Sequence, residues 1–187
     1  MTDAGILNPL SALTKNIPLS VNVVLQIFLE MEKKESMRKL LIGLCIILID
    51  QLSKSWVEKN IPFTEYLEIN HFFKIVHFQN TGAAFSFLDS ASGWQNNFFI
   101  LLTLAILTYL IYLYRQNIYS PYGSISIMLI ISGAIGNLID RFSNGHVTDF
   151  IYLHINEYYW PAFNVADSAI TIGAIIYLLG LLKGKIK

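Results

Sequence analysis

The sequence has 187 residues, of which 54% are hydrophobic and 14% charged, and its net charge is zero. A soluble domain of this size carries a larger charged surface, so the composition excludes an ordinary soluble globular protein. The scattered Lys and Arg residues exclude the basic patch of a nucleic-acid-binding protein. A single cysteine, Cys45, and four histidines without metal-motif spacing indicate neither a disulfide framework nor a metal site.

Four apolar stretches approach the length of about 20 residues with which a helix crosses a bilayer. They lie at about 39–56, 97–114, 124–140 and 163–182. The third carries Ser132, Gly133, Ala134 and Gly136 in its later half, and such small residues let helices approach closely in a membrane. We therefore predict an all-α membrane protein with a bundle of four transmembrane helices.

The distribution of Lys and Arg predicts the orientation of these helices. Nine of the thirteen lie before the first helix, between the second and third, or after the fourth. Because cytoplasmic segments carry the excess of Lys and Arg, both termini are predicted to be cytoplasmic. The connections 57–96 and 141–162 then lie outside.

The two outer connections are rich in aromatic and β-branched residues. Residues 67–79 alternate in part between apolar and polar and predict one or two strands. The turn signal Asn144-Gly145 precedes a second aromatic segment at 150–163, in which His154 is interpreted, like His146, as a surface group of a loop. We predict a small periplasmic β-rich subdomain at the membrane interface.

The first 36 residues form a separate segment. Residues 21–29 are apolar but too few to span a bilayer, and no cleavage motif follows them. They form either a peripheral helix or part of an extension ahead of a working start at Met37. We favour the extension, and treat 1–36 as an N-terminal segment and 37–187 as the membrane domain.

Polar side chains occur at the predicted outer ends of the apolar stretches. They are Asp50, Asn137, Asp140, Arg141, Asn164 and Asp167. An ionisable group at membrane depth costs about 2.5–3.5 kcal/mol on insertion scales, so such groups indicate a functional site. Helical spacing places Asn137, Asp140 and Arg141 on one face, and places Asn164 and Asp167 on one face of the fourth helix.

Several of these residues have a structural alternative. Asp140 could pair with Arg141, Asp50 could brace its helix end, and the asparagines could join helices by hydrogen bonds. Asp149 and Asp167 fit such roles less well, because neither has a cation nearby on its own segment. Two carboxylates of this kind suggest a pair that shares one proton, as in aspartic proteases, with Asp140 as a rival member.

Five motifs in order make the chain from about Met37 onward similar to the bacterial lipoprotein signal peptidase (signal peptidase II) family. They are DQLSK at 50–54, QNTGAAFS at 79–86, GAIGNLIDR at 133–141, GHVTDF at 145–150 and FNVADSAI at 163–170. The resemblance implies an aspartyl endopeptidase that removes the signal peptide from diacylglyceryl-modified prolipoproteins, on the amino side of the lipidated cysteine. It implies that Asp149 and Asp167 are catalytic. The supporting set is Asp50, Lys54, Asn80, Asn137, Asp140, Arg141 and Asn164.

The resemblance implies no metal or organic cofactor. We expect a monomer in the bacterial cytoplasmic membrane, with its site at the outer face and with lipids and prolipoproteins as its partners. Two other function classes make different predictions. A proton-coupled transporter predicts midplane carboxylates and an internal repeat, and the sequence displays neither. A non-catalytic scaffold predicts that Asp-to-Asn changes at both positions are harmless.

Overall fold

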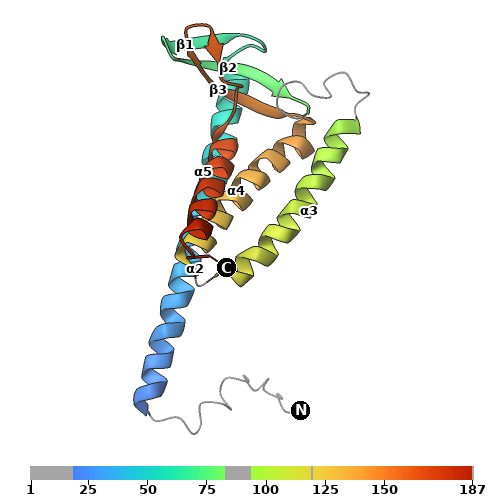
Figure 1. Ribbon diagram of the computed structural model, residues 1–187. Coiled ribbons are helices and arrows are strands. Elements are labelled where there is room, and N and C mark those ends of the chain that lie inside the picture. Colours follow the sequence, from blue (N-terminus) through green and yellow to red (C-terminus); the bar gives the residue numbers. More distant parts are fainter. Residues whose placement is uncertain (1–18, 83–93, 119, 187) are drawn as a thin grey trace, which may run out of the picture. The chain divides into compact units, whose positions relative to one another are not determined.

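The computed structural model describes the backbone of residues 19–82, 94–118 and 120–186, and the side chains from Ser36 onward within these ranges (Figure 1). The chain divides into two compact units, Met1–Arg38 and Lys39–Lys187, and the second contains the fold considered below. The helices are α2 (Leu19–Asn60), α3 (Trp94–Gln116), α4 (Pro121–Asn144) and α5 (Val165–Leu182). The strands are β1 (Tyr66–Asn70), β2 (Phe73–Asn80), β3 (Val147–Ile155) and β4 (Tyr158–Tyr159).

The four predicted membrane helices are confirmed. Among the described residues, four helical segments are long and apolar enough to cross a membrane: Ser36–Asn60, Trp94–Gln116, Pro121–Asn144 and Val165–Leu182. Three of them extend beyond the predicted stretches because their ends are set by capping residues and turns as well as by apolar residues. For example, Ser120 caps α4 by accepting a hydrogen bond from the Gly123 N–H, and Gly145 ends the helix with φ of 77°.

The predicted N-terminal segment is only partly described. Residues 21–29, too short to span alone, lie within α2, whose later part is the first candidate span. Residues 1–18 lie outside the described residues. Residues 83–93, which include the end of the QNTGAAFS motif, also lie outside the described residues.

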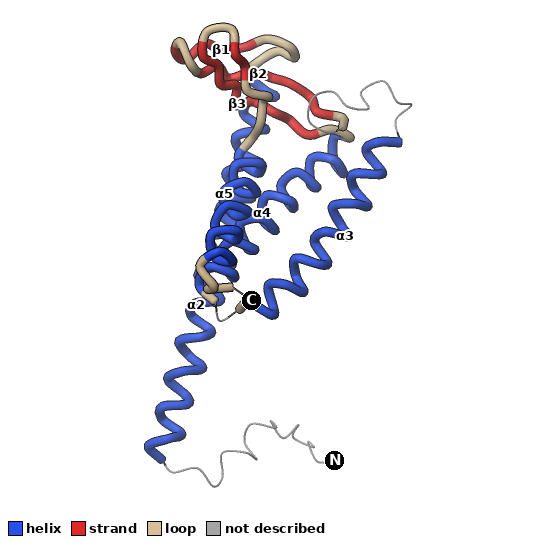
Figure 2. The backbone as a smooth tube through the Cα atoms, viewed as in Figure 1, coloured by secondary structure: helices blue, strands red, loops and turns tan. Residues whose placement is uncertain are grey.

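The strands form one antiparallel sheet in the order β1-β2-β3-β4, which lies beyond one end of the helices (Figure 2). The strands predicted within 67–79 are confirmed as β1 and β2. The second aromatic segment also contains strands, β3 and β4, so the interpretation of His154 as a loop residue was wrong. His154 belongs to β3, is half-buried, and stacks on Tyr159 with ring centroids 5.2 Å apart.

Two apolar clusters connect the elements. Val57 in the last turn of α2 and Ile61 directly after this helix pack with Phe150 of β3, which attaches the sheet to α2. Leu107 of α3 packs with Ala134 and Leu138 of α4. Many other large apolar side chains of the helices are exposed, as expected where lipid is the surrounding solvent.

Small residues allow α4 and α5 to approach closely, as predicted. A Cβ atom added to Gly133 would overlap the carbonyl oxygen of Ala166, and one added to Gly136 would lie 2.7 Å from an Asp50 carboxylate oxygen. Backbone atoms cannot move aside as a flexible side chain can. The glycine at 133 is therefore a condition of this helix pairing.

We expect Gly133→Ala to lower the stability of the folded protein by about 1–3 kcal/mol, because the added methyl group forces α4 away from α5. The measurement is thermal unfolding of the purified protein in detergent. Ala105→Val is the control, since it adds methyl groups at an exposed position of α3. An unfolding temperature of Gly133→Ala equal to that of the wild type would contradict the steric argument.

Candidate active site

The first turn of α5 fixes the position of Asp167. Asn164 is the N-cap of this helix, and its Oδ1 accepts a hydrogen bond from the Asp167 N–H at 2.9 Å. The Asp167 carboxylate in turn accepts from the Asn164 N–H at 3.2 Å. This reciprocal capping box follows from the local sequence Asn-Val-Ala-Asp and places the carboxylate where the helix dipole favours negative charge.

Asp149 comes from the sheet and meets the same asparagine. It lies in β3 opposite Phe78, next to a point where β2 has one more residue than β3. Its Oδ1 accepts from Asn164 Nδ2 at 2.8 Å and its Oδ2 from Asn80 Nδ2 at 3.0 Å. Asn164 therefore hydrogen-bonds to both aspartates that the sequence singled out.

The two aspartates influence each other electrostatically. Asp149 is only 5% exposed. Burial, together with the negative charge of Asp167, raises the pKa of Asp149 to about 7, although hydrogen bonds from Asn80 and Asn164 oppose this rise. At neutral pH this carboxyl group is therefore divided between its acidic and its basic form.

Asn137 of α4 supports the pair from the other side. Its Nδ2 donates to Asp167 Oδ1 at 2.8 Å. Its Oδ1 accepts from Lys54 Nζ at 3.0 Å and from Asn164 Nδ2 at 3.2 Å. The asparagine side chain thus connects the aspartate pair to a second polar group centred on α2.

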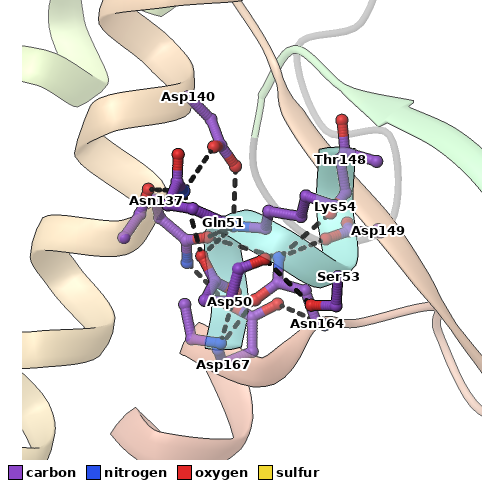
Figure 3. A network of polar contacts seen from close by, with 12 residues as sticks. Asp50, Gln51, Ser53, Lys54, Asn137, Asp140, Thr148, Asp149, Asn164 and Asp167 are labelled. Atoms are coloured by element: carbon purple, nitrogen blue, oxygen red, sulfur yellow. Dashed lines mark hydrogen bonds and ion pairs between the residues drawn. The ribbon is translucent and has the colours of Figure 1, made fainter. Parts of the chain in front are cut away.

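That second group is a buried lysine shared by two carboxylates (Figure 3). Lys54 Nζ lies 2.7 Å from Asp50 Oδ2 and 2.6 Å from Asp140 Oδ2. None of the three residues is more than 4% exposed. Gln51 extends the network by donating to Asp140 Oδ1 at 2.9 Å. These contacts join α2 to α4 around one cation.

Asp50 also holds the start of α5. Its Oδ1 accepts a hydrogen bond from the Ala166 N–H at 2.8 Å. The first N–H groups of a helix have no partner within the helix, so a carboxylate from α2 supplies one here. Asp50 thereby braces the N-terminal end of another helix, whereas the sequence suggested that it braces the end of its own.

Arg141 lies beside the pair but does not join the lysine cluster. The alternative that Asp140 pairs with Arg141 was wrong, because the ion partner of Asp140 is Lys54. The Arg141 guanidinium lies 5.3 Å from the ring centroid of Phe99, and its Nη1 donates to the Asn137 carbonyl oxygen at 3.5 Å. Its buried Nε–H makes no hydrogen bond with the described residues.

The structure thus brings together the residues that the sequence predicted, from α2, β2, α4, β3 and α5. The sequence did not single out three further residues. These are Gln51, which lies within the DQLSK motif, and Thr148 and Glu58, which hydrogen-bond to each other. No group of three or more His, Cys, Asp or Glu side chains in the described part of the chain is arranged to hold a metal ion.

Comparisons with known proteins point to one family. A family model described as signal peptidase (SPase) II matches residues 42–183. A lipoprotein signal peptidase of Xylella fastidiosa (strain M12) is 46% identical over 151 residues, which cover 78% of this chain and 89% of that protein. One of Pseudoalteromonas atlantica is 37% identical over 161 residues, covering 84% of this chain and 96% of that protein.

Solved structures with a similar fold are also known. One, described as a bacterial membrane enzyme determined by the in meso method at 2.3 Å resolution, aligns with a TM-score of 0.70 and 35% identity. The alignment covers 78% of this chain and 88% of that one. A second such structure, at 1.9 Å resolution, aligns with a TM-score of 0.69 and 33% identity.

The lysine cluster yields a prediction about stability. Lys54→Met leaves Asp50 and Asp140 buried without their cation, and breaking a buried ion pair in this way costs about 3–5 kcal/mol. We expect a marked fall in the unfolding temperature in detergent. Lys59→Met, at an exposed position five residues later, is the control. Equal unfolding temperatures of the two variants would show that the lysine cluster does not stabilise the helix packing.

Proposed function

Because this chain belongs to the signal peptidase II family, we propose that it is an aspartyl endopeptidase that removes the signal peptide from diacylglyceryl-modified prolipoproteins. The observation that supports this most is the joining of Asp149 and Asp167 through Asn164. A buried carboxyl group, Asp149, and a half-buried one, Asp167, are held together by neutral amides. Acid–base hydrolysis of a peptide needs two carboxyl groups of this kind.

We propose that Asp149 holds the proton of the pair and that Asp167 is ionised. Asp167 lies in the first turn of α5 and accepts hydrogen bonds from Asn137 and from the Asn164 N–H, and these contacts and the helix dipole stabilise its ionised form. Asp149 lies on a strand, without a helix dipole, and its pKa of about 7 keeps a large share of it in the acid form at neutral pH. The two groups are coupled, so the proton belongs to the pair as a unit.

The reaction then proceeds in two steps. Asp167 removes a proton from a water molecule whose oxygen attacks the peptide carbonyl carbon, while Asp149 donates its proton to the carbonyl oxygen. The resulting tetrahedral diol collapses when Asp149 takes back a hydroxyl proton and Asp167 delivers its own to the leaving nitrogen. The C–N bond breaks, and each carboxyl group regains its starting state.

The supporting residues are proposed to act on the pair and on the substrate backbone. Asn80, Asn137 and Asn164 orient the carboxylates through the hydrogen bonds described above. We propose that the Arg141 guanidinium, whose Nη1 donates to the Asn137 carbonyl oxygen, also donates a hydrogen bond to a substrate carbonyl. Asp50, Lys54 and Asp140 hold the helices that carry these groups.

We further propose that the enzyme works as a monomer in the bacterial cytoplasmic membrane, with both termini in the cytoplasm. The excess of Lys and Arg around the termini supports this orientation. The site then faces outward, at the level where a membrane-embedded signal helix reaches its lipidated cysteine. Cleavage on the amino side of that cysteine would release the signal helix and leave the lipid on the product.

The aspartate pair can be tested directly. We expect Asp149→Asn and Asp167→Asn each to abolish cleavage of a lipidated prolipoprotein by the purified enzyme, because each removes one of the two acid–base groups. Asp140→Asn, whose ion partner is Lys54, is the comparison, and we expect a slower but measurable reaction. Normal cleavage by either of the first two variants would overturn the assignment.

The raised pKa of Asp149 predicts how its replacement changes stability with pH. Between the ordinary pKa of 3.8 and about 7 the unfolded chain ionises this group while the folded chain keeps it protonated, so wild-type stability falls as pH rises. The slope is about 1.4 kcal/mol per pH unit within this window. Asp149→Asn cannot ionise. Its unfolding temperature relative to the wild type should therefore increase from pH 5 to pH 8 in detergent, and a constant difference would contradict a raised pKa.

A further inference from the structure

The last turns of α2 contact β3 through a polar pair. Thr148 Oγ1 donates a hydrogen bond of 2.5 Å to Glu58 Oε1. Glu58 follows Lys54 by one helical turn, as Lys54 follows Asp50, so these three residues lie along one side of α2. Asp50 contacts α5, Lys54 contacts α4, and Glu58 contacts β3.

The threonine in this pair is directly adjacent to Asp149. Successive side chains of a strand point to opposite faces, so Thr148 faces α2 while Asp149 faces Asn164 and Asn80. The next residue, Phe150, packs with Val57 and Ile61 on the α2 side, as this alternation requires. The Thr148 carbonyl oxygen also accepts from Asn164 Nδ2 at 3.4 Å.

The two residues of this hydrogen bond differ in solvent exposure, and the cost of breaking the bond falls on the buried one. Thr148 is fully buried, whereas Glu58 is exposed. The exposed carboxylate of Glu58 contributes little to the stability of the folded protein by itself. A buried hydroxyl group that loses its acceptor lowers the stability of the folded protein. A shift of β3 that lets the Thr148 hydroxyl find another partner would relieve this cost. The segment that shifts would contain Asp149.

We propose that Glu58 is a positioning residue for Asp149, acting through the hydroxyl group of Thr148. The inference rests on the proposed function and deepens it. Glu58 does not touch the aspartate pair; it holds the strand that presents Asp149 to Asn164. Two contacts with the end of α2 hold β3 in place, one on each side of Asp149. They are the hydrogen bond at Thr148 and the apolar packing of Phe150.

The experiment compares truncated and conservative variants at both positions. Glu58→Ala and Thr148→Val remove the hydrogen bond, and we expect each to lower kcat by roughly 10-fold to 100-fold, since small misplacements of reacting groups have effects of this size. KM should stay within about twofold, because substrate contacts are unchanged. Glu58→Gln and Thr148→Ser keep an acceptor and a donor, and both should restore near-normal kcat.

Two further readouts separate positioning from a merely structural role. The double variant Glu58→Ala, Thr148→Val should be no slower than Thr148→Val alone, because both changes break one contact. The alkaline limb of the kcat profile should move to higher pH, because a displaced Asp149 loses the asparagine hydrogen bonds that favour its ionised form. Glu68→Ala, at an exposed position of β1, is the control and should change neither quantity.

Amide hydrogen exchange tests the same contact without any substrate. Glu58→Ala should speed exchange at residues 147–150 and leave the far end of β3, near Leu153, unchanged. Wild-type kcat, pH profile and exchange in Glu58→Ala and Thr148→Val would overturn the proposal while leaving the protease assignment intact. A loss of activity that only follows the folded fraction would overturn it too. If the wild type itself fails to cleave, the proposed function falls, and the exchange result alone supports or refutes the restraint on β3.

Discussion

The arrangement of this site depends on one buried cation. The Lys54 ammonium group lies between Asp50 and Asp140, and all three residues are almost completely removed from solvent. Burying an ion costs several kcal/mol, and the cost is offset only when its partners are in the correct place. Because Asp140 belongs to α4 and Asp50 caps α5, the ion fixes three helices together. Helices that slid past one another would leave a bare charge, so few alternative packings are accessible.

The aspartate pair is held in a different way, by neutral amides. Asn80, Asn137 and Asn164 all donate to Asp149 or Asp167, and none of them brings a positive charge. A cation in their place would stabilise both carboxylates as anions and remove the shared proton. Lys54 forms ion pairs with Asp50 and Asp140 instead, and its hydrogen-bonded link to Asp167 runs through Asn137. Amide contacts fix the geometry and preserve the repulsion from Asp167, which together with burial raises the pKa of Asp149.

The gathering of the polar residues at the helix ends could be predicted from the sequence, because each polar group at membrane depth is costly and because helix directions alternate. Lys54 and Asn80 were assigned to the site only through the family resemblance. The individual partners of the polar residues could not be predicted. Proximity in sequence suggested Arg141 as the ion partner of Asp140, but successive helical residues point about 100° apart, and Lys54 fills the space that Asp140 faces. The strand β3 was not predicted because its buried residues 147–150 do not alternate in polarity. The Glu58–Thr148 contact joins residues 90 positions apart, and no local pattern encodes it.

The energetics of Asp149 also bear on which class of protein this is. A scaffold that needed only a hydrogen-bonding group in β3 would be more stable with an amide, which has no ionised form to desolvate. The chain instead keeps a carboxyl group whose burial and whose neighbour Asp167 disfavour its charge at neutral pH. Proteins retain such destabilising groups where their titration is used. A carrier would use it along a path through the bilayer, but here the pair lies where the helix ends meet the sheet, with Asp149 on a strand outside the candidate spans. This location fits the proposed proton transfer to a peptide substrate better than transport of a proton across the bilayer.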